Sequence, residues 1–188
     1  MSIAPDLSIY KQSLAGEWEL RRSEAEEWRP ISVPGSWEAA GLPKDDPGPF
    51  WYRKIFSVPS HYAGKRIWLH FGGVSYDCQV RVNGQAVAEH RGLWDAFQVE
   101  ITRAVQVGEN AELLLLVEKP ASLTAGPDSQ TVPGSFPLRQ TISGFLPYVW
   151  GHIFGGIWQD VELYASGQAA ITSFCAFGDP AGLVKVQA

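Results

Sequence analysis

The residues that could carry out catalysis or bind a metal ion are few and widely separated in this chain. The histidines show no ligand spacing such as His-x-x-x-His, and Cys78 and Cys175 do not complete a zinc set. No serine lies in the Gly-x-Ser-x-Gly elbow of a serine hydrolase. The run Asp45-Asp46-Pro47-Gly48 lacks the alternating oxygen ligands of a calcium loop and is typical of a solvated turn. The sequence therefore predicts no metal site, no cofactor and no catalytic residue in this chain.

Tryptophans are the other candidates, because a sugar ring can stack its apolar face on an aromatic ring. The same residue type also supplies bulk in cores and interfaces. Trp51 and Trp158 are expected opposite the apolar faces of their strands, which favours packing against a neighbouring domain. Trp18 and Trp68 are expected in the core or between sheets. The tryptophans that could bind a carbohydrate are Trp51, Trp94, Trp150 and Trp158.

Composition and charge argue against several classes of protein. Apolar residues make up 45% and charged residues 19% of the 188 residues, which is typical of a globular domain. The formal net charge of -5 argues against a nucleic-acid partner, because such binding needs clustered cations. No apolar stretch reaches the ~18 residues of a membrane helix, and the N-terminus lacks a signal-peptide pattern. We therefore expect a cytoplasmic protein with no membrane partner.

Alternation of apolar and polar residues is the dominant pattern, and it predicts strands rather than helices. The clearest example runs from Tyr76 to Asn83, where every second residue is apolar. Asn83-Gly84 tolerates the positive φ of a type I′ turn, so Gln85 to Glu89 should return as the second strand of a hairpin. Cys78, on the apolar face, is expected to be a buried and unreactive thiol.

Further strands are predicted along most of the chain. Leu113 to Val117 is an unbroken apolar run, which predicts a central strand buried on both faces. Helical signals are brief: Ser36 could cap a short helix ending at Gly41, and Thr102 another ending at Gly108. Many short strands without crossover helices predict an all-β fold of packed antiparallel sheets, a sandwich or jelly roll. The other expected strands are Gly16–Leu20, Arg29–Val33, 51–58, 66–71, Phe97–Ile101, 157–163 and Ile171–Phe177.

Two long loops interrupt this pattern, one from Pro34 to Pro49 and one from Lys119 to about Gly155. Loops of that length in a compact domain are usually functional or disordered. The second loop turns aromatic at Phe145-Leu146-Pro147-Tyr148-Val149-Trp150, which argues against a mere spacer.

Five stretches, in this order, resemble the N-terminal sugar-binding domain of family 2 glycoside hydrolases, the group of β-galactosidases, β-glucuronidases and β-mannosidases. Each is weak alone, but the ordered set spans roughly residues 14 to 165. The stretches are Leu14-Ala15-Gly16-Glu17-Trp18, Val33-Pro34-Gly35-Ser36-Trp37, Trp51-Tyr52-Arg53-Lys54 with Phe56 and Pro59, Leu69-His70-Phe71-Gly72-Gly73-Val74 through Val82-Asn83-Gly84 to Phe97 and Ile101-Thr102, and Gly155-Gly156-Ile157-Trp158-Gln159-Asp160-Val161.

The resemblance implies a galactose-binding-like jelly roll over residues 1–166, followed at 167–188 by a connector and the first strands of an immunoglobulin-like domain. In such enzymes a TIM barrel carries both catalytic carboxylates, and the acid/base lies in an Asn-Glu pair. Here Asn83 precedes Gly and Asn110 precedes Ala, so the pair is absent. A barrel would also need ~250 residues. By this resemblance the chain alone should not hydrolyse glycosides, and its partners would be a carbohydrate and the missing domains of a homo-oligomeric parent.

The resemblance also bears on substrate-binding residues. In the β-galactosidases and β-glucuronidases of the family, an acidic residue six positions before a Gly-Ile pair reaches the active site. Counting back six positions from Gly156 gives Trp150 instead of an acidic residue. This difference weakens the case for galactose or glucuronate as the substrate. The expected role is accessory, supporting the barrel and lending the 119–155 loop to a pocket wall. An independent carbohydrate-binding module and a structural or oligomer-forming sandwich are the alternatives. The candidate substrate-binding residues are Trp150, His152, Tyr148 and Asp46.

Overall fold

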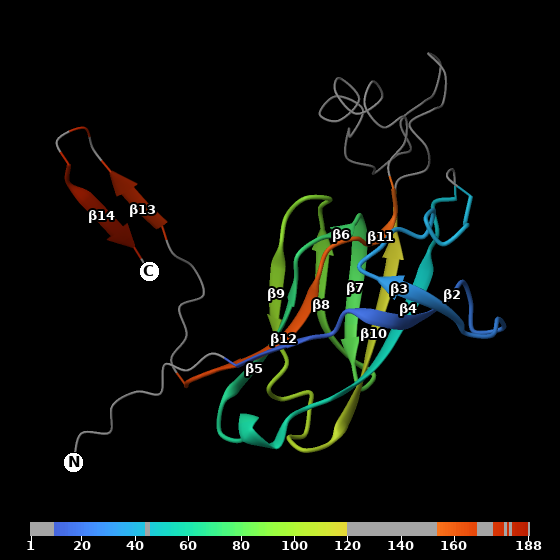
Figure 1. Cartoon of the computed structure of the whole chain (residues 1–188), viewed down its shortest axis with the longest axis horizontal. Coiled ribbons are helices and arrows are strands. Elements are labelled where there is room, and N and C mark those ends of the chain that lie inside the picture. The colour runs from blue at the N-terminus through green and yellow to red at the C-terminus, as the bar shows by residue number, and fades with distance from the viewer. Residues whose placement is uncertain are drawn as a thin grey trace.

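A computed structural model of the chain shows an almost entirely β architecture (Figure 1). The structure describes residues 10–43, 46–119, 154–168, 175–178, 180 and 182–187. Within these ranges, the one helical segment is the single 3-10 turn η1 (Ser60–Tyr62). No described helix is long and apolar enough to cross a membrane.

Two antiparallel sheets face each other and form the sandwich, which confirms the predicted all-β jelly-roll class. The short strands β6 (Val74–Ser75) and β11 (Gly156–Ile157) form a separate two-stranded sheet. A second two-stranded sheet pairs β13 (Cys175–Gly178) with β14 (Val184–Gln187). The six-stranded sheet has the order β3 (Arg29–Val33), β2 (Gly16–Arg21), β4 (Phe50–Ser57), β10 (Asn110–Glu118), β7 (Asp77–Val82), β8 (Gln85–Arg91). The four-stranded sheet has the order β1 (Tyr10–Ser13), β12 (Val161–Ser166), β5 (Arg66–Phe71), β9 (Phe97–Glu100).

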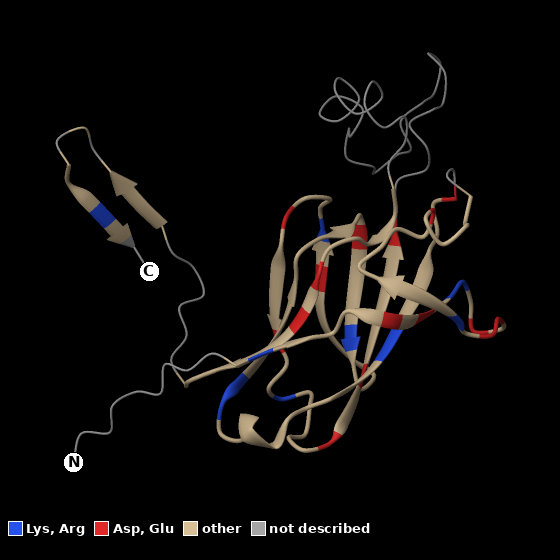
Figure 2. Cartoon of the chain, viewed as in Figure 1, with Lys and Arg blue, Asp and Glu red and all other residues tan. Residues whose placement is uncertain are grey.

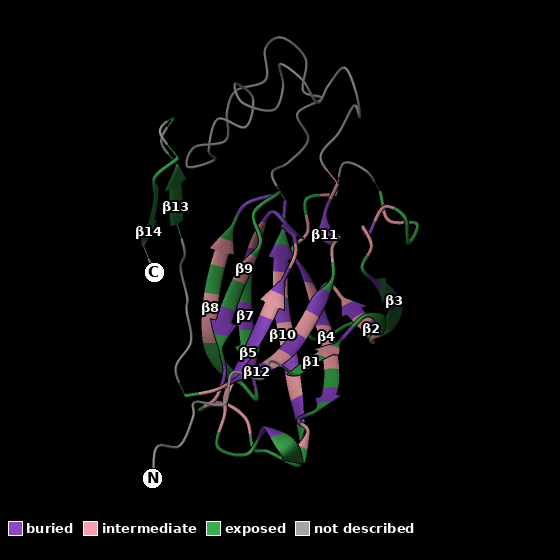
Figure 3. Ribbon diagram, turned by 60° about the vertical axis from the view of Figure 1, so that its left-hand side comes forward, coloured by how far each residue is buried: buried purple, intermediate pink, exposed green. Residues whose placement is uncertain are grey.

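The core lies between the two sheets and is built from alternate residues of each strand, as Figure 3 shows for β10 and β4. In β10, Leu113, Leu115 and Val117 are fully buried in it. Leu114 and Leu116 point to the outer face and are only half-buried. The expectation of burial on both faces was therefore wrong: β10 is central within its sheet, but no second layer among the described residues covers its outer face.

The hairpin formed by β7 and β8 confirms the prediction from the Asn-Gly turn. Asn83 and Gly84 have φ values of 49° and 79°, as a type I′ turn requires. Cys78, Val80 and Val82 face the core, and a bulge at Val80/Arg81 shifts the register of the returning strand. The bulge places Arg81 opposite Ala86, whereas Gln79 remains opposite Glu89.

The two short helices expected after Ser36 and Thr102 do not form. Ser36 accepts a hydrogen bond from the amide of Ala39 (3.2 Å), but the chain makes only turns before Gly41. The Thr102 hydroxyl instead accepts the Ile67 amide (2.9 Å), which ties the end of β9 to β5. The Ser36 bond is local and the turns stop at Gly41 (φ 89°), whereas the Thr102 hydroxyl is held by a tertiary hydrogen bond.

The hairpin of β13 and β14 is the last described part of the chain. Its register pairs Cys175 with Gln187 and Gly178 with Val184. Large apolar side chains on it, among them Phe177 and Val186, are more than half exposed. A two-stranded hairpin alone is marginally stable in water, so burial of its exposed apolar side chains would stabilise it.

Candidate functional site

The candidate site lies at the end of the sandwich where the long predicted loop leaves β10 and returns to β11. Three of the predicted substrate-binding residues, Tyr148, Trp150 and His152, lie outside the described residues. Lys119 and Phe154 are the described residues at either side of that segment. The site is therefore built from the residues that hold these two positions.

Glu38 holds both sides of the segment at once. Its carboxylate forms an ion pair with Nζ of Lys119 and accepts a hydrogen bond from the Gly155 amide, at 3.0 Å to Oε1. The side chains of Lys119 and Glu38 are only 1% and 7% exposed. Because buried charges are costly unless paired and hydrogen-bonded, this clamp fixes where the chain leaves the sandwich and where it returns.

The two glycines that follow allow the returning chain to approach the core. The Trp37 amide donates to the Gly155 carbonyl (3.0 Å), and a Cβ on Gly155 would come within 2.0 Å of the Trp37 ring. Gly156 has φ +119° and lies against the Tyr52 hydroxyl. Burial, with a smaller effect of the Glu38 charge, raises the pKa of Tyr52 far above its usual value, so this phenol stays protonated.

Three aromatic rings, here called the aromatic cluster, lie at the same end: Trp94, Phe154 and Trp158. Trp158 meets Trp94 and Phe154 edge to face, with ring centroids 5.1 and 5.4 Å apart. Nε1 of Trp158 donates to the Leu93 carbonyl (2.9 Å), and its ring packs on Gly73, where a Cβ would be 2.8 Å away. Trp94 is 48% exposed, so the cluster presents an aromatic surface at the rim of the site.

Asp46, the fourth predicted substrate-binding residue, is engaged in a structural interaction. Its carboxylate pairs with Arg22 and accepts the Gly48 amide (3.0 Å), and its side chain is only 13% exposed. Burial alone would raise the pKa of Asp46, but these hydrogen bonds keep it below the usual value. Asp46 is thus not a freely solvated turn residue. The carbonyl of Pro47 accepts the Lys119 amide (2.9 Å), so the loop of Asp46 does lie beside the clamp.

The two tryptophans that were expected at a domain interface, Trp158 and Trp51, lie in different places. Trp158 is half-buried within the aromatic cluster, whereas Trp51 is half-buried on the outer face of β4, where Arg81 lies 5.8 Å from its ring.

The sequence did not predict the pairing of Glu38 with Lys119. The pairing joins positions 81 residues apart, and neither residue stands in a pattern that could have indicated it.

No three His, Cys, Asp or Glu side chains gather into a metal-binding group within the part of the chain that the structure describes. The described part of the site offers the rings of the aromatic cluster, backbone polar groups and the buried Glu38–Lys119 ion pair, which carries no net charge. Such a set suits binding of a polar, partly apolar ligand and supplies no general acid, general base or nucleophile of its own.

Residues 46–143, more than half of the 188-residue chain, match the family described as glycosyl hydrolase 2 galactose-binding domain-like. The chain belongs to this family. The ordered motifs identified in the sequence had indicated the same group.

Similar proteins include a β-galactosidase of Thermoanaerobacter pseudethanolicus, 43% identical over 68 residues, covering 36% of this chain and 9% of the relative. A β-glucuronidase of Paenibacillus borealis is 26% identical over 177 residues, which cover 81% of this chain and 28% of the relative. The structure of a β-D-glucuronidase from Dictyoglomus thermophilum superposes with a TM-score of 0.69 at 20% sequence identity. The superposition covers 94% of this chain and 32% of the glucuronidase, so the two share the fold. The chain spans less than a third of the length of these relatives.

Proposed function

We propose that this chain is the non-catalytic domain of a family 2 exo-glycosidase, supporting a catalytic barrel and lending its 119–155 segment to one wall of the substrate pocket. The observation that carries the proposal is the Glu38 clamp, which holds Lys119 and Gly155 together at the end of the sandwich. A buried ion pair at the base of a long segment is expected where that segment must be presented in one position.

The chemistry would belong to the rest of the parent protein. Retaining hydrolysis needs two carboxylates flanking the scissile bond, in a barrel of ~250 residues that this chain does not contain. The similar proteins named β-galactosidase and β-glucuronidase support a glycoside substrate. In this proposal Trp150, His152 and Tyr148 face the sugar, and Asp46 contributes through the loop it stabilises.

The second part of the proposal concerns domain organisation. The jelly roll would occupy residues 1–166, and residues 167–188 would begin an immunoglobulin-like domain. The exposed apolar side chains of the β13–β14 hairpin, such as Phe177 and Val186, support this, because later strands of that domain would cover them. We expect the parent to be a cytoplasmic homo-oligomer.

Activity assays test the accessory role. The chain of residues 1–188 should not turn over aryl β-glucuronides, β-galactosides or β-mannosides, whereas the parent that includes the barrel should hydrolyse at least one. In the parent, Trp150→Ala and His152→Ala should lower kcat/KM by about tenfold or more with little change in Tm. Ile55→Ala, an exposed residue on the outer face of β4, is the matched control. Turnover by the 188-residue chain, or unchanged kcat/KM in both loop variants, would overturn the proposal.

NMR titration of the same chain with galactose, glucuronate, mannose and glucose separates the alternatives. No shifts at the indole Nε1 signals of Trp94 and Trp158 are expected if the pocket is completed only by the barrel. Shifts at these two signals in the isolated chain would instead support an independent carbohydrate-binding module. Self-association without sugar binding or an effect on turnover would support the structural alternative.

A further inference from the structure

A second polar surface lies on the outer face of the six-stranded sheet, away from the core. Three neighbouring strands, β10, β7 and β8, place their outward side chains in two registered rows. The first row crosses the sheet as Leu116, Gln79 and Glu89, and the second as Glu118, Asp77 and Arg91. We call these six residues the outer array. Figure 2 shows the acidic ends of β7 and β10 beside the basic end of β8.

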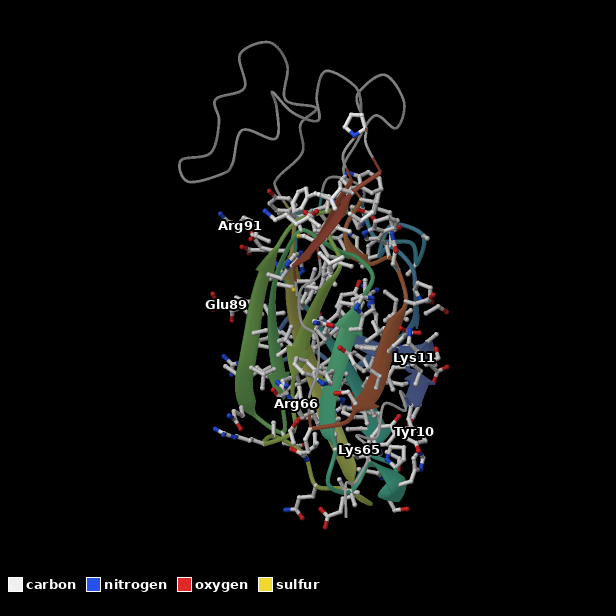
Figure 4. The ribbon with its side chains drawn as sticks, turned by 90° about the vertical axis from the view of Figure 1, so that its left-hand side faces the viewer. Tyr10, Lys11, Lys65, Arg66, Glu89 and Arg91 are labelled. Carbon is white, nitrogen blue, oxygen red and sulfur yellow. The ribbon has the colours of Figure 1, made fainter. Side chains whose placement is uncertain are left out.

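The outer array lines a groove of about 430 Å³, together with Cys78 and His90. That volume lies within the range of small-molecule sites in proteins. Figure 4 shows Glu89 and Arg91 projecting from β8 away from the sandwich, and both residues line the groove. The groove is distinct from the Glu38 clamp and uses none of its residues.

Polar groups in the groove retain hydrogen-bonding capacity. Arg91 pairs with Asp77, Nε to Oδ1 at 2.5 Å, which leaves its other guanidinium donors directed to no described protein group. Gln79, Glu89 and Glu118 are exposed, and none of them makes a side-chain hydrogen bond or ion pair with another described residue. The groove therefore offers amide and guanidinium donors beside carboxylate acceptors.

Apolar surface also borders the groove, through Leu116. Leu116 lies between Gln79 on β7 and Trp51 on β4 in the same registered row. Trp51 and Leu116 are both half-buried, so each retains some exposed apolar surface. A ligand in the groove would thus meet the side chain of Leu116 as well as the polar groups, with Trp51 next to Leu116 on the neighbouring strand.

We propose that this groove binds a neutral sugar residue of a glycan, without chemistry. Vicinal hydroxyls both donate and accept, which matches carboxylate acceptors beside amide and guanidinium donors, and the C–H face of the ring would contact Leu116, the apolar side chain that lines the groove. A bare cation would use only the carboxylates and would leave the amide donors of Gln79 and the remaining guanidinium donors of Arg91 unused. A uronate would be repelled by the like charges of Glu89 and Glu118, so we expect it to bind more weakly than a neutral sugar.

The test is a heteronuclear NMR titration of the 188-residue chain with cellobiose, lactose, mannobiose and glucuronate. We expect at least one neutral disaccharide to shift the side-chain amide of Gln79 and the Nε signal of Arg91, with weaker shifts from glucuronate. Gln79→Ala combined with Glu89→Ala should weaken that binding by about tenfold or more, equivalent to 1.4 kcal/mol. Glu27→Gln, in an exposed turn, should leave it unchanged.

Three outcomes would overturn this inference. They are silence at Gln79 and Arg91 with every neutral disaccharide, an equal loss of binding in the Glu27→Gln control, and a response to glucuronate as strong as to neutral sugars. Shifts at the Trp94 and Trp158 indoles alone would place sugar binding at the loop end instead. Because the two surfaces report through different residues, failure of this inference leaves the accessory function standing, and the reverse also holds.

Discussion

Glu38 and Lys119 form an ion pair in which both side chains are almost completely buried, 7% and 1% exposed. The two residues are 81 positions apart, and Glu38 also binds the amide of Gly155. One carboxylate thereby joins three separate parts of the chain: the turn after Ser36, the end of β10 and the start of β11. Removing it would leave a buried ammonium group and a buried amide without this partner.

The first prediction concerns that clamp. Glu38→Ala should lower the free energy of unfolding by about 3–5 kcal/mol, because it leaves the buried charge of Lys119 without its carboxylate. Urea unfolding followed by tryptophan fluorescence measures this loss. The matched control is Glu162→Gln, which breaks the exposed Lys11–Glu162 pair (3.0 Å) and should cost less than about 1 kcal/mol. Equal losses in the two variants would show that the buried pair does not stabilise the site.

The second prediction concerns the close approach of Gly155 to Trp37. Gly155→Ala should destabilise the protein by about 1–3 kcal/mol, because the new Cβ would lie 2.0 Å from the fully buried ring of Trp37. Gly178→Ala, where a Cβ meets nothing within 4 Å, should be nearly neutral. Thermal unfolding of the two variants compares them. A neutral Gly155→Ala would mean that Trp37 and the returning chain are not packed as described.

Local patterns in the sequence predicted most of the sandwich, because side-chain alternation and turn chemistry act over a few residues. The Asn83-Gly84 turn and the alternation before it placed β7 and β8 correctly. The apolar run Leu113 to Val117 identified β10 but not its half-exposed outer face. An unbroken apolar run gives no period, so it cannot show which face a second layer covers.

Contacts between distant strands determine the features that local sequence patterns did not predict. Trp68 was expected in the core or between the sheets, but it lies outside the core cluster. It is nevertheless only 6% exposed, because Tyr164 stacks on it and its Nε1 donates to Ser166. The Glu38 clamp and the outer array depend in the same way on contacts between distant strands. The family motifs indicated where a site should be, but the side chains that build its base are set by the packing of the sheets.

The third prediction concerns the two cysteines. Burial raises the pKa of the Cys78 thiol to about 12, whereas Cys175 is exposed. A thiol reagent such as 5,5′-dithiobis(2-nitrobenzoate) at pH 8 should therefore modify Cys175 alone in the native protein, since the thiolate is the reacting form. Cys78 should react only when denaturant unfolds the sandwich. Cys175→Ser removes the fast reaction, and any rapid labelling that persists in that variant would contradict the burial of Cys78.

The fourth prediction concerns the pH dependence of stability and rests on His90. Burial lowers the pKa of His90, which stacks on Phe97 with ring centroids 4.1 Å apart, and the charges of Asp95 and Asp77 only partly oppose this. The unfolded chain then binds a proton at about pH 6.5 while the folded protein does not. The stability contributed by neutral His90 is therefore fully present above about pH 6.5 and decreases as the pH falls towards its lower folded value.

His90→Phe should remove this decrease. Tm measured between pH 5 and pH 7.5 should fall less steeply in the variant than in the unsubstituted protein. Carboxylates with lowered pKa values, such as Asp46, lose their stabilising effect only as the pH falls below about 4, outside this window. The Asp95→Asn variant provides the opposite comparison, because removing a charge that favours protonated His90 should steepen the fall. Identical slopes in all three proteins would mean that His90 is solvated in the native state.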